Sequence, residues 1–414
     1  MVYGLQLKHI VIHTTEDGKC QVDKKKYLSV PEMIETHLRT GEPITNAPGT
    51  ILRRPIIRQP WELSHDDITL VQKIGEGAFG EVHRGKLRLP TRKYVEVAIK
   101  IAKTDKMTKE KIKEMMKEAR LMRNYNHPNI VKIYGVAVEH EPLMIIMEFI
   151  TGGALDEYLR KNGKYVDLEE KLANMCAGAS WGIEYLHYKN CIHRVIAAHN
   201  NLKMNSKNFN FQVKISDFGL SRKGNTYQLT TAKKLPIRWL SPETLSSGLY
   251  TQKSDVYSFG IMVWEIFSNG SEPYEDMGNG EVQQRVSELI TFTFIKTTKL
   301  SSFVQLYEIQ VLCGYRMEFP RSTPKEVADM ILTRCWDANP DKRWNMYQVA
   351  REFEAYTNAK PPPETVVLIK RMKPIRLSKA AKKVYKNREK SDDFPLSLDD
   401  TIATVTGTAG AYTT

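Results

Sequence analysis

Two stretches of the sequence carry residues suited to binding phosphate groups. GEGAFGEV, residues 75–82, places Gly75, Gly77 and Gly80 between two predicted strands. Glycines let a backbone approach phosphate oxygens closely and offer N–H groups with no Cβ in the way. Lys100 ends the run VAIK and could direct a single positive charge at the same phosphates. Taken singly, the glycines also fit a flexible hairpin and Lys100 an ordinary strand end, so the prediction depends on the combination.

Carboxylate and amide side chains elsewhere could complete such a site. Glu118 lies in a segment predicted to be helical, residues 109–124, where it could hold Lys100 through a charge-assisted hydrogen bond or be one more exposed helix charge. Asp217, in SDFGLS, supplies a carboxylate for Mg²⁺, and Asn200 offers a second, neutral oxygen. We therefore expect a phosphate and magnesium site assembled from distant parts of the chain.

The elements around these residues predict two lobes. Residues 68–102 read as strands, and the glycine stretch is followed by another strand, which argues against the strand-to-helix order of dinucleotide-binding folds. After residues 147–155 the chain becomes mainly helical. A strand-rich part followed by a helix-rich part is an α+β arrangement.

The chain divides into four predicted regions. We predict a small mixed unit at residues 1–60, a linker at 61–67, a two-lobed domain at 68–356 and a basic, disordered tail at 357–414. In the first unit KHIVIHTT predicts a strand, and Ser29 predicts a helix start with capping-box spacing.

The composition is that of an ordinary globular protein. Hydrophobic residues make up 41% and charged residues 26% of the 414 residues. No stretch reaches about 18 uncharged apolar residues, so no membrane span is expected. The five cysteines are scattered without a CxxC pair, which argues against disulfides and zinc and for a cytoplasmic setting. The first residues lack the pattern of a secretory signal, and Val2 stands where N-myristoylation needs glycine.

Much of the net charge of +13 lies in residues 370–390. This run favours a solvated tail. Contact with an anionic membrane is the alternative and would make the protein membrane-peripheral, whereas no nucleic-acid partner is expected.

The motifs resemble, as a set, the signature of protein kinases. They occur in the family order: the glycine stretch, Lys100, Glu118, CIHRVIAAHNNL (191–202), SDFGLS and Ser241-Pro242-Glu243. LPIRWLSPE, SDVYSFGIMVWEIFS and RCWDANPDKRW are similar to the tyrosine-kinase version. The resemblance covers about residues 68–355 and, with the first unit, indicates the cytoplasmic Fes/Fer group of tyrosine kinases.

The resemblance implies a bilobal protein-kinase fold, ATP and Mg²⁺ as cofactors, and a protein substrate or signalling partner. The implied nucleotide-binding residues are Ile74, Gly75, Gly77, Gly80, Val82, Ala98, Lys100, Glu118, Met147 and Glu148, and the implied metal ligands are Asn200 and Asp217. Met147 would stand at the gate of the adenine pocket, and Glu148 would begin the hinge. Glu243 and Arg343 would form an ion pair that braces the helical lobe.

Tyr227 lies between SDFGLS and the Ser-Pro-Glu motif. The resemblance implies a regulatory tyrosine whose phosphate pairs with an arginine of the catalytic loop, here Arg194. An exposed loop tyrosine without that role is the alternative.

The catalytic loop departs from the family pattern at one decisive position. Val195 stands where the pattern has aspartate, between the catalytic-loop residues Arg194 and Asn200, and His199 replaces an arginine. The aspartate accepts the proton of the substrate hydroxyl, and valine has no lone pair with which to do so. A positioned base contributes about 10²–10⁴ in rate. We therefore expect an ATP-binding but catalytically impaired member, with an active tyrosine kinase and a faulty gene model of one as the alternatives.

Residues 5–60 resemble the second half of an SH2 domain, with Trp61 at the junction to the next domain. The resemblance implies that the arginine which grips phosphotyrosine belongs to a segment before residue 1. His9 matches a supporting position, but one histidine cannot replace a bidentate arginine. Phosphotyrosine binding by residues 1–60 is therefore not expected, and packing is the expected role.

Two stretches are longer than the family spacing. KMNSKNFNFQ (203–212) lengthens the segment between Asn200 and Asp217, and residues 287–313 interrupt family-like sequence. The second stretch is interpreted as translated non-coding sequence in preference to a surface loop, because loops of that length are uncommon in compact domains.

Overall fold

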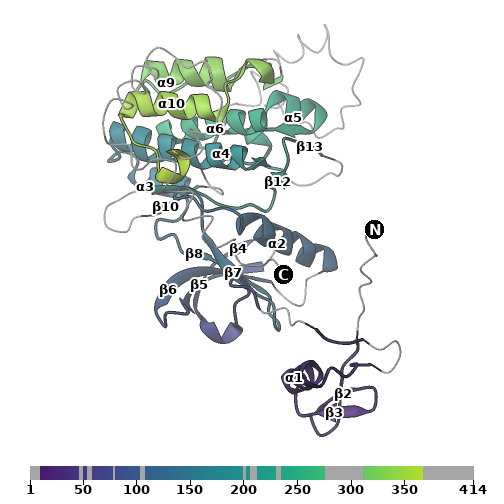
Figure 1. Cartoon of the computed structure of the whole chain (residues 1–414). Helices are drawn as coiled ribbons and strands as arrows, with labels where there is room; N and C mark the ends of the chain where they lie inside the picture. The colour runs from purple at the N-terminus through teal and green to yellow at the C-terminus, as the bar shows by residue number, and fades with distance from the viewer. Residues whose placement is uncertain are drawn as a thin grey trace, which may run out of the picture. The chain divides into compact units, whose positions relative to one another are not determined.

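The computed structural model describes residues 10–45, 50–53, 58–77, 80–102, 108–198, 202–205, 212–229, 235–275, 311–312 and 314–366. The chain divides into two compact units, Met1–Glu62 and Leu63–Thr414. Figure 1 shows the first unit in purple and the second from blue to yellow. Several predicted features lie outside the described residues, namely His9, His199, Asn200, the run 370–390 and all of 287–313 except 311–312.

The first unit has a small antiparallel sheet and one helix. Its strands, in the order β1-β2-β3, are β1 (His13–Thr14), β2 (Cys20–Val22) and β3 (Lys25–Tyr27), and its helix is α1 (Val30–Thr40). The predicted helix start is confirmed, because the Ser29 hydroxyl accepts a hydrogen bond from the Glu32 N–H at 3.3 Å. The strand predicted from KHIVIHTT is shorter than expected, since in its described part only His13 and Thr14 pair with β2.

The second unit begins with an antiparallel five-stranded sheet. The strands, in the order β4-β5-β6-β8-β7, are β4 (Ile68–Gly77), β5 (Gly80–Arg88), β6 (Tyr94–Ala102), β7 (Ile133–Ala137) and β8 (Met144–Glu148). Side chains alternate between the two faces of β6, so Val97 and Ile99 enter the core of the sheet and Lys100 lies on the other face. Helix α2 (Lys109–Met122) buries Met115 and Glu118 on one face.

Residues 63–67, which the sequence suggested as part of a linker, belong to the second unit. The Leu63 N–H donates to the Val136 carbonyl at 2.9 Å, which places this residue beside β7. A short 3₁₀ turn, η1 (His65–Asp67), follows, and Asp67 forms an ion pair with Arg88 at 2.7 Å. The division between the units therefore falls after Glu62.

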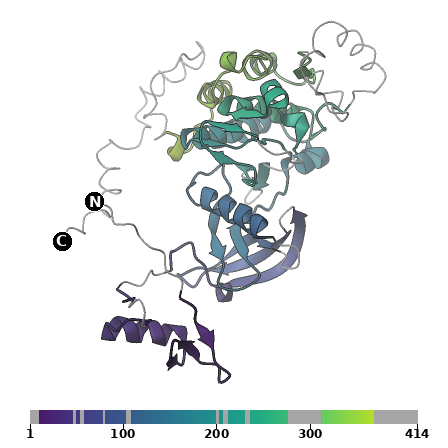
Figure 2. The same ribbon diagram turned by 90° about the vertical axis from the view of Figure 1, so that its right-hand side faces the viewer.

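The rest of the second unit is mainly helical (Figure 1; Figure 2). Its helices are α3 (Leu155–Asn162), the π-helical η3 (Glu170–Ala177), α4 (Gly178–Tyr188), α5 (Pro242–Ser247), α6 (Gln252–Phe267), α9 (Lys325–Met330), the π-helical η6 (Ile331–Cys335) and α10 (Met346–Thr357), with 3₁₀ turns η5 (Ile237–Trp239) and η7 (Pro340–Lys342). The predicted two-lobed α+β architecture is confirmed.

Three two-stranded antiparallel ribbons link the loops of the helical lobe. Their strands are β9 (Cys191–Ile192) with β12 (Arg222–Lys223), β10 (Leu202–Asn205) with β11 (Gln212–Ile215), and β13 (Thr226–Gln228) with β14 (Leu249–Thr251). The segments that carry the predicted site therefore follow short, paired strands.

Helix α6 is the centre of the helical lobe. Its residues are buried on all sides, as expected for a helix that is apolar around its whole circumference. Gly260 is required by a close approach, because a Cβ there would lie 2.5 Å from the indole nitrogen of Trp336. Among the described residues no helix has the length and apolar character needed to cross a membrane.

A buried charge cluster joins α4 to α10. Arg351 donates to both oxygens of Glu184, at 3.2 and 2.9 Å, and to Glu354 at 2.7 Å. The indole N–H of Trp181 also donates to Glu354, at 2.8 Å. Burial raises the pKa of Glu184 to about 7, although the charge of Arg351 lowers it. The sequence did not predict this cluster.

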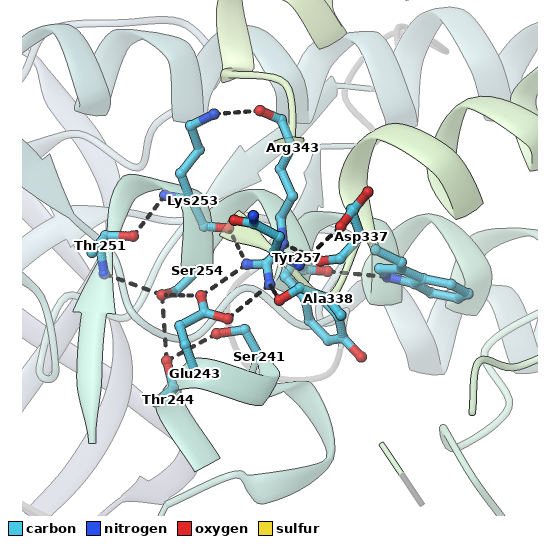
Figure 3. A network of polar contacts seen from close by, with 12 residues as sticks. Ser241, Glu243, Thr244, Thr251, Lys253, Ser254, Tyr257, Asp337, Ala338 and Arg343 are labelled. Atoms are coloured by element: carbon cyan, nitrogen blue, oxygen red, sulfur yellow. Dashed lines mark hydrogen bonds and ion pairs between the residues drawn. The ribbon is translucent and has the colours of Figure 1, made fainter. Parts of the chain in front are cut away.

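The predicted ion pair between Glu243 and Arg343 is confirmed (Figure 3). The guanidinium donates to both carboxylate oxygens, at 2.8 and 2.7 Å, and its Nε donates to the Asp337 carbonyl at 2.7 Å. Burial alone would raise the pKa of Glu243, but the hydrogen bonds and charge of Arg343 outweigh burial and lower the pKa. The pair fastens α5 to the turn before α10.

Replacement of Arg343 by lysine tests this fastening. A lysine keeps the charge but cannot donate to Glu243 and to the neighbouring carbonyls at once. Removing one partner from a buried pair costs roughly 3–5 kcal/mol, so Arg343→Lys should lower the free energy of unfolding by about 2–4 kcal/mol. Urea denaturation measures the change. The exposed Arg334→Lys is the matched control and should stay within about 0.5 kcal/mol of the natural protein; equal losses in the two variants would contradict the assignment.

Candidate nucleotide-binding site

Lys100 and Glu118 form the predicted ion pair. Lys100 Nζ lies 2.8 Å from Glu118 Oε2, and the two side chains are 13% and 3% exposed. Burial raises the pKa of Glu118, the ammonium of Lys100 lowers it, and the carboxylate of Asp217 raises it further. The charges of Lys100 and Asp217 therefore act in opposite directions on the buried Glu118.

Asp217 is exposed to solvent, whereas the next residue, Phe218, is buried. The backbone of Asp217 is left-handed, with φ of 59°, and its Oδ1 accepts from the Gly219 N–H at 3.3 Å. Phe218 is 1% exposed, and its ring lies 5.1 Å from that of His193 and 5.7 Å from that of Tyr125. The buried ring thus holds an exposed carboxylate in place, which suits a ligand for Mg²⁺ carried by phosphates.

The glycine stretch closes the hairpin between β4 and β5. Gly75 pairs with Val82 and Gly77 with Gly80. Gly80 has φ of 145°, a conformation that favours glycine, whereas a Cβ at Gly75 would meet nothing within 4 Å. The N–H groups of this hairpin are the ones that could approach phosphate oxygens.

Four of the predicted nucleotide-binding residues share one face of the sheet, namely Val82, Ala98, Lys100 and Met147, whereas Glu148 lies opposite Val97 on the other face. Val82 lies opposite Lys100, and Ala98 lies opposite Met147. Residues opposite each other on neighbouring strands, or two apart on one strand, point to the same side of a sheet. Ile74, on β4, is 46% exposed. This arrangement brings apolar side chains beside the lysine.

Glu148 uses its side chain to join the lobes. Its Oε2 forms an ion pair with Lys214 Nζ at 3.1 Å, and Lys214 also donates to the Pro128 carbonyl at 2.7 Å. Lys214, on β11, was not predicted from the sequence. The carboxylate of Glu148 is therefore engaged in structure, and a ligand at the hinge would meet the backbone.

The catalytic loop is held by two buried acidic side chains of α6, Asp255 and Glu265. Asp255 accepts from the N–H groups of His193 and Arg194 at 2.8 and 2.7 Å. Glu265 accepts from the Ala198 N–H at 3.0 Å. The sequence analysis did not identify either acidic residue. An acidic residue within an otherwise apolar helix is nevertheless a signal, because such a group is buried only where hydrogen-bond donors contact it.

Val195 is 5% exposed within this loop. Its carbonyl oxygen lies 2.8 Å from His193 Nδ1, and His193 Nε2 lies 3.1 Å from the Ser216 carbonyl. The histidine ring therefore links the loop to the residue before Asp217. Residues 191–198 and 202, the described part of the stretch 191–202, contain no carboxylate, and the side chain at 195 is an isopropyl group with nothing basic.

Arg194 lies between two tyrosine rings. Its guanidinium is 4.4 Å from the ring centre of Tyr227 and 4.2 Å from that of Tyr250, and Tyr227 and Tyr250 are paired across β13 and β14. Arg222 lies 5.2 Å from the Tyr227 ring. The structure thus brings the predicted regulatory tyrosine to Arg194 and adds a second arginine that the sequence did not indicate.

Comparison with known proteins places these features in a family. Residues 68–353 match the family described as protein tyrosine and serine/threonine kinase. The chain is 39% identical over 332 residues to Fer-related kinase 1 of Caenorhabditis elegans, covering 80% of this chain and 76% of that protein. It is 35% identical over 351 residues to tyrosine-protein kinase Fer of Homo sapiens, covering 84% of this chain and 38% of the relative.

A viral relative shows the same relation. The chain is 34% identical over 341 residues to the tyrosine-protein kinase transforming protein Fps of Fujinami sarcoma virus, covering 82% of this chain and 35% of that protein. The chain therefore spans most of the nematode relative and little more than a third of the human and viral ones.

The buried Glu265 predicts a pH dependence of stability. Burial raises the pKa of Glu265 from 4.5 to about 8, although the hydrogen bond from Trp239 lowers it. Between these pH values the folded state keeps a proton that the unfolded state releases. The free energy of unfolding should therefore fall as pH rises through this window, by at most about 1.4 kcal/mol per pH unit, and level off above it.

Glu265→Gln removes this titration. Denaturant unfolding between pH 5 and 9 should show a smaller decline for this variant than for the natural protein. Glu157→Gln, which alters an exposed carboxylate on α3, is the control and should follow the natural protein. Parallel curves for all three proteins would contradict the raised pKa.

Proposed function

The chain belongs to the protein tyrosine and serine/threonine kinase family, and on that premise we propose that its kinase domain binds Mg-ATP but is catalytically impaired. Val195 is the reason for the impairment, because it occupies the position of the catalytic base. The proposed role is that of a signalling scaffold in the cytoplasm. Its partners would be proteins, and the names of its relatives favour a tyrosine-kinase ancestry.

The single observation that carries nucleotide binding is the buried ion pair of Lys100 and Glu118. Kinases need this lysine–glutamate pair and the metal-binding aspartate in place together. Lys100 would contact the phosphates of ATP. Asp217, with Asn200, would hold Mg²⁺, which when bound neutralises the charge of the phosphate oxygens.

Impaired transfer follows from the chemistry of the loop. Phosphoryl transfer depends mainly on positioning and charge, and the base that orients the acceptor hydroxyl supplies a further factor of about 10²–10⁴. The loop around Val195 keeps its backbone hydrogen bonds to Asp255. We therefore assign the defect to the carboxylate that is missing at position 195.

Regulation through Tyr227 is part of the proposal. A phosphate on this tyrosine would lie near Arg194 and Arg222, and arginines form strong charge-assisted bonds with phosphate. Another kinase would have to add it. Residues 1–60 would act by packing, without phosphotyrosine binding.

Nucleotide binding can be measured by thermal stability. A ligand at 100 times its Kd stabilises the folded state by about 2.7 kcal/mol, so Mg-ATP should raise the melting temperature of the natural protein. Asp217→Asn should abolish the rise without lowering the melting temperature in the absence of nucleotide, because the side chain is exposed. Asp341→Asn, at another exposed aspartate, is the control and should keep the full rise. No rise in the natural protein would contradict the proposal.

Val195→Asp tests the assignment of the defect. The variant should transfer phosphate from ATP to a tyrosine-containing peptide about 10²–10⁴ times faster than the natural protein. Its Mg-ATP melting shift serves as the check that it folds. Turnover by the natural protein at the usual kinase rates of about 1–100 s⁻¹ would instead select an active tyrosine kinase. A folded variant with no gain would show that Val195 is not the limiting defect.

A further inference from the structure

The segment that follows α10 folds back onto the second unit. It lies beyond residue 353, where the family match ends, and falls in the region expected to be a tail. Residues 363–366 form a helical turn in which the Thr365 N–H donates to the Pro362 carbonyl at 2.9 Å. Thr365 is fully buried, and Ala359 packs against the core of the helical lobe. We call residues 358–366 the C-terminal strap.

The strap is fastened by a buried hydrogen bond to His127. His127 Nε2 lies 2.8 Å from the Thr365 hydroxyl oxygen, and the Asn129 N–H donates to His127 Nδ1 at 3.0 Å. Because Nδ1 is an acceptor, the ring hydrogen is on Nε2 and donates to Thr365. Burial lowers the pKa of His127 to about 3, so the ring is neutral at physiological pH.

His127 begins a turn, residues 127–129, that also holds β11. Asn129 Nδ2 donates to the Val213 carbonyl at 2.9 Å, and the Ile215 N–H donates to the Asn129 carbonyl at 2.8 Å. Asp217 follows Ile215 by two residues. Helix α2, which carries Glu118, ends five residues before His127. The turn is therefore joined to the segments that carry both carboxylates of the candidate site, to α2 along the chain and to β11 by hydrogen bonds.

Helix α4 closes a further side of the same turn. A Cβ at Gly182 would lie 2.7 Å from the Asn129 carbonyl oxygen, and one at Gly178 would lie 2.9 Å from Asn129 Nδ2. Only residues without a side chain permit this approach. Asn129 is thus held by α4 and by β11. The hydrogen bond from His127 to Thr365 of the strap holds the other end of the turn.

We infer that Thr365 is a positioning residue, which acts through His127 to hold the turn 127–129 and with it the carboxylates of the nucleotide site. The effect of Thr365 on nucleotide affinity rests on the proposed function, whereas its effect on the turn 127–129 does not. Valine at 365 would keep the shape of threonine but leave the His127 N–H buried without its acceptor, whereas serine would keep the hydroxyl.

Hydrogen exchange in the full chain tests the turn directly. In Thr365→Val the amides of Asn129 and Ile215 should exchange about 5–30 times faster, the factor expected when a buried hydrogen bond is lost. Amides in the centre of α6 should change less, because they report global opening. Thr365→Ser should resemble the natural protein. Unchanged exchange in Thr365→Val, or a larger effect of serine than of valine, would overturn the inference.

Nucleotide affinity separates positioning from general stability. Thr365→Val should raise the Kd for Mg-ATP about 3–10-fold, because fewer molecules hold the competent arrangement. Ile266→Val, a truncation in the core of α6, should lower the melting temperature and leave the Kd unchanged. Thr333→Val removes an exposed hydroxyl that bonds Asp329, and it should alter neither measurement. An equal rise of the Kd in all three variants would overturn the positioning role.

The two proposals fail differently. If the natural protein shows no binding of Mg-ATP, the proposed function fails, and exchange at Asn129 and Ile215 still decides the role of Thr365. If Mg-ATP binds equally well to Thr365→Val and to the natural protein, the proposed function stands and the positioning role is wrong.

Discussion

The carboxylate of Asp255 accepts hydrogen bonds from two consecutive backbone N–H groups of the catalytic loop, those of His193 and Arg194. A carboxylate in the apolar interior of α6 is stable only if such donors reach it. The loop, in turn, can close in this shape only where an acceptor is present. Neither requirement involves the side chain at position 195. The backbone conformation of the loop therefore does not depend on the aspartate that the family has at this position. Val195 lacks the basic carboxylate, but the hydrogen bonds to Asp255 that hold the loop are present.

The same principle recurs elsewhere in the second unit. Loops are held by side chains of regular elements that bind backbone groups: Glu265 on α6 accepts from the Ala198 N–H, and Lys214 on β11 donates to the Pro128 carbonyl. Such bonds tolerate changes in the loop side chains, because each residue except proline offers the same N–H and each offers the same carbonyl. The nucleotide cluster of Lys100 and Glu118 differs, since it needs two particular side chains.

The sequence predicted those parts of the structure that depend on local pattern. The apolar run that ends in Lys100 predicted the strand β6, and the helical periodicity of residues 109–124 predicted the helix α2, which carries Glu118. The order of motifs led to the pairing of Glu243 with Arg343 across 100 positions. The contacts that the sequence did not predict have no local signal. Asp255 binds backbone groups about 60 residues away, and Thr365 of the strap contacts His127 across 238 positions. Such contacts arise from the packing of whole elements, which no window of sequence contains.

The charge cluster of Glu184, Arg351 and Glu354 has a consequence for whatever is attached to the end of the described chain. By locking α10 to α4 it sets the direction in which the polypeptide leaves the helical lobe. The strap then runs from α10 to the turn 127–129, which Thr365 contacts through His127. Val366 is the last described residue. A protein attached downstream of this point would therefore be tethered close to His127 and the turn 127–129.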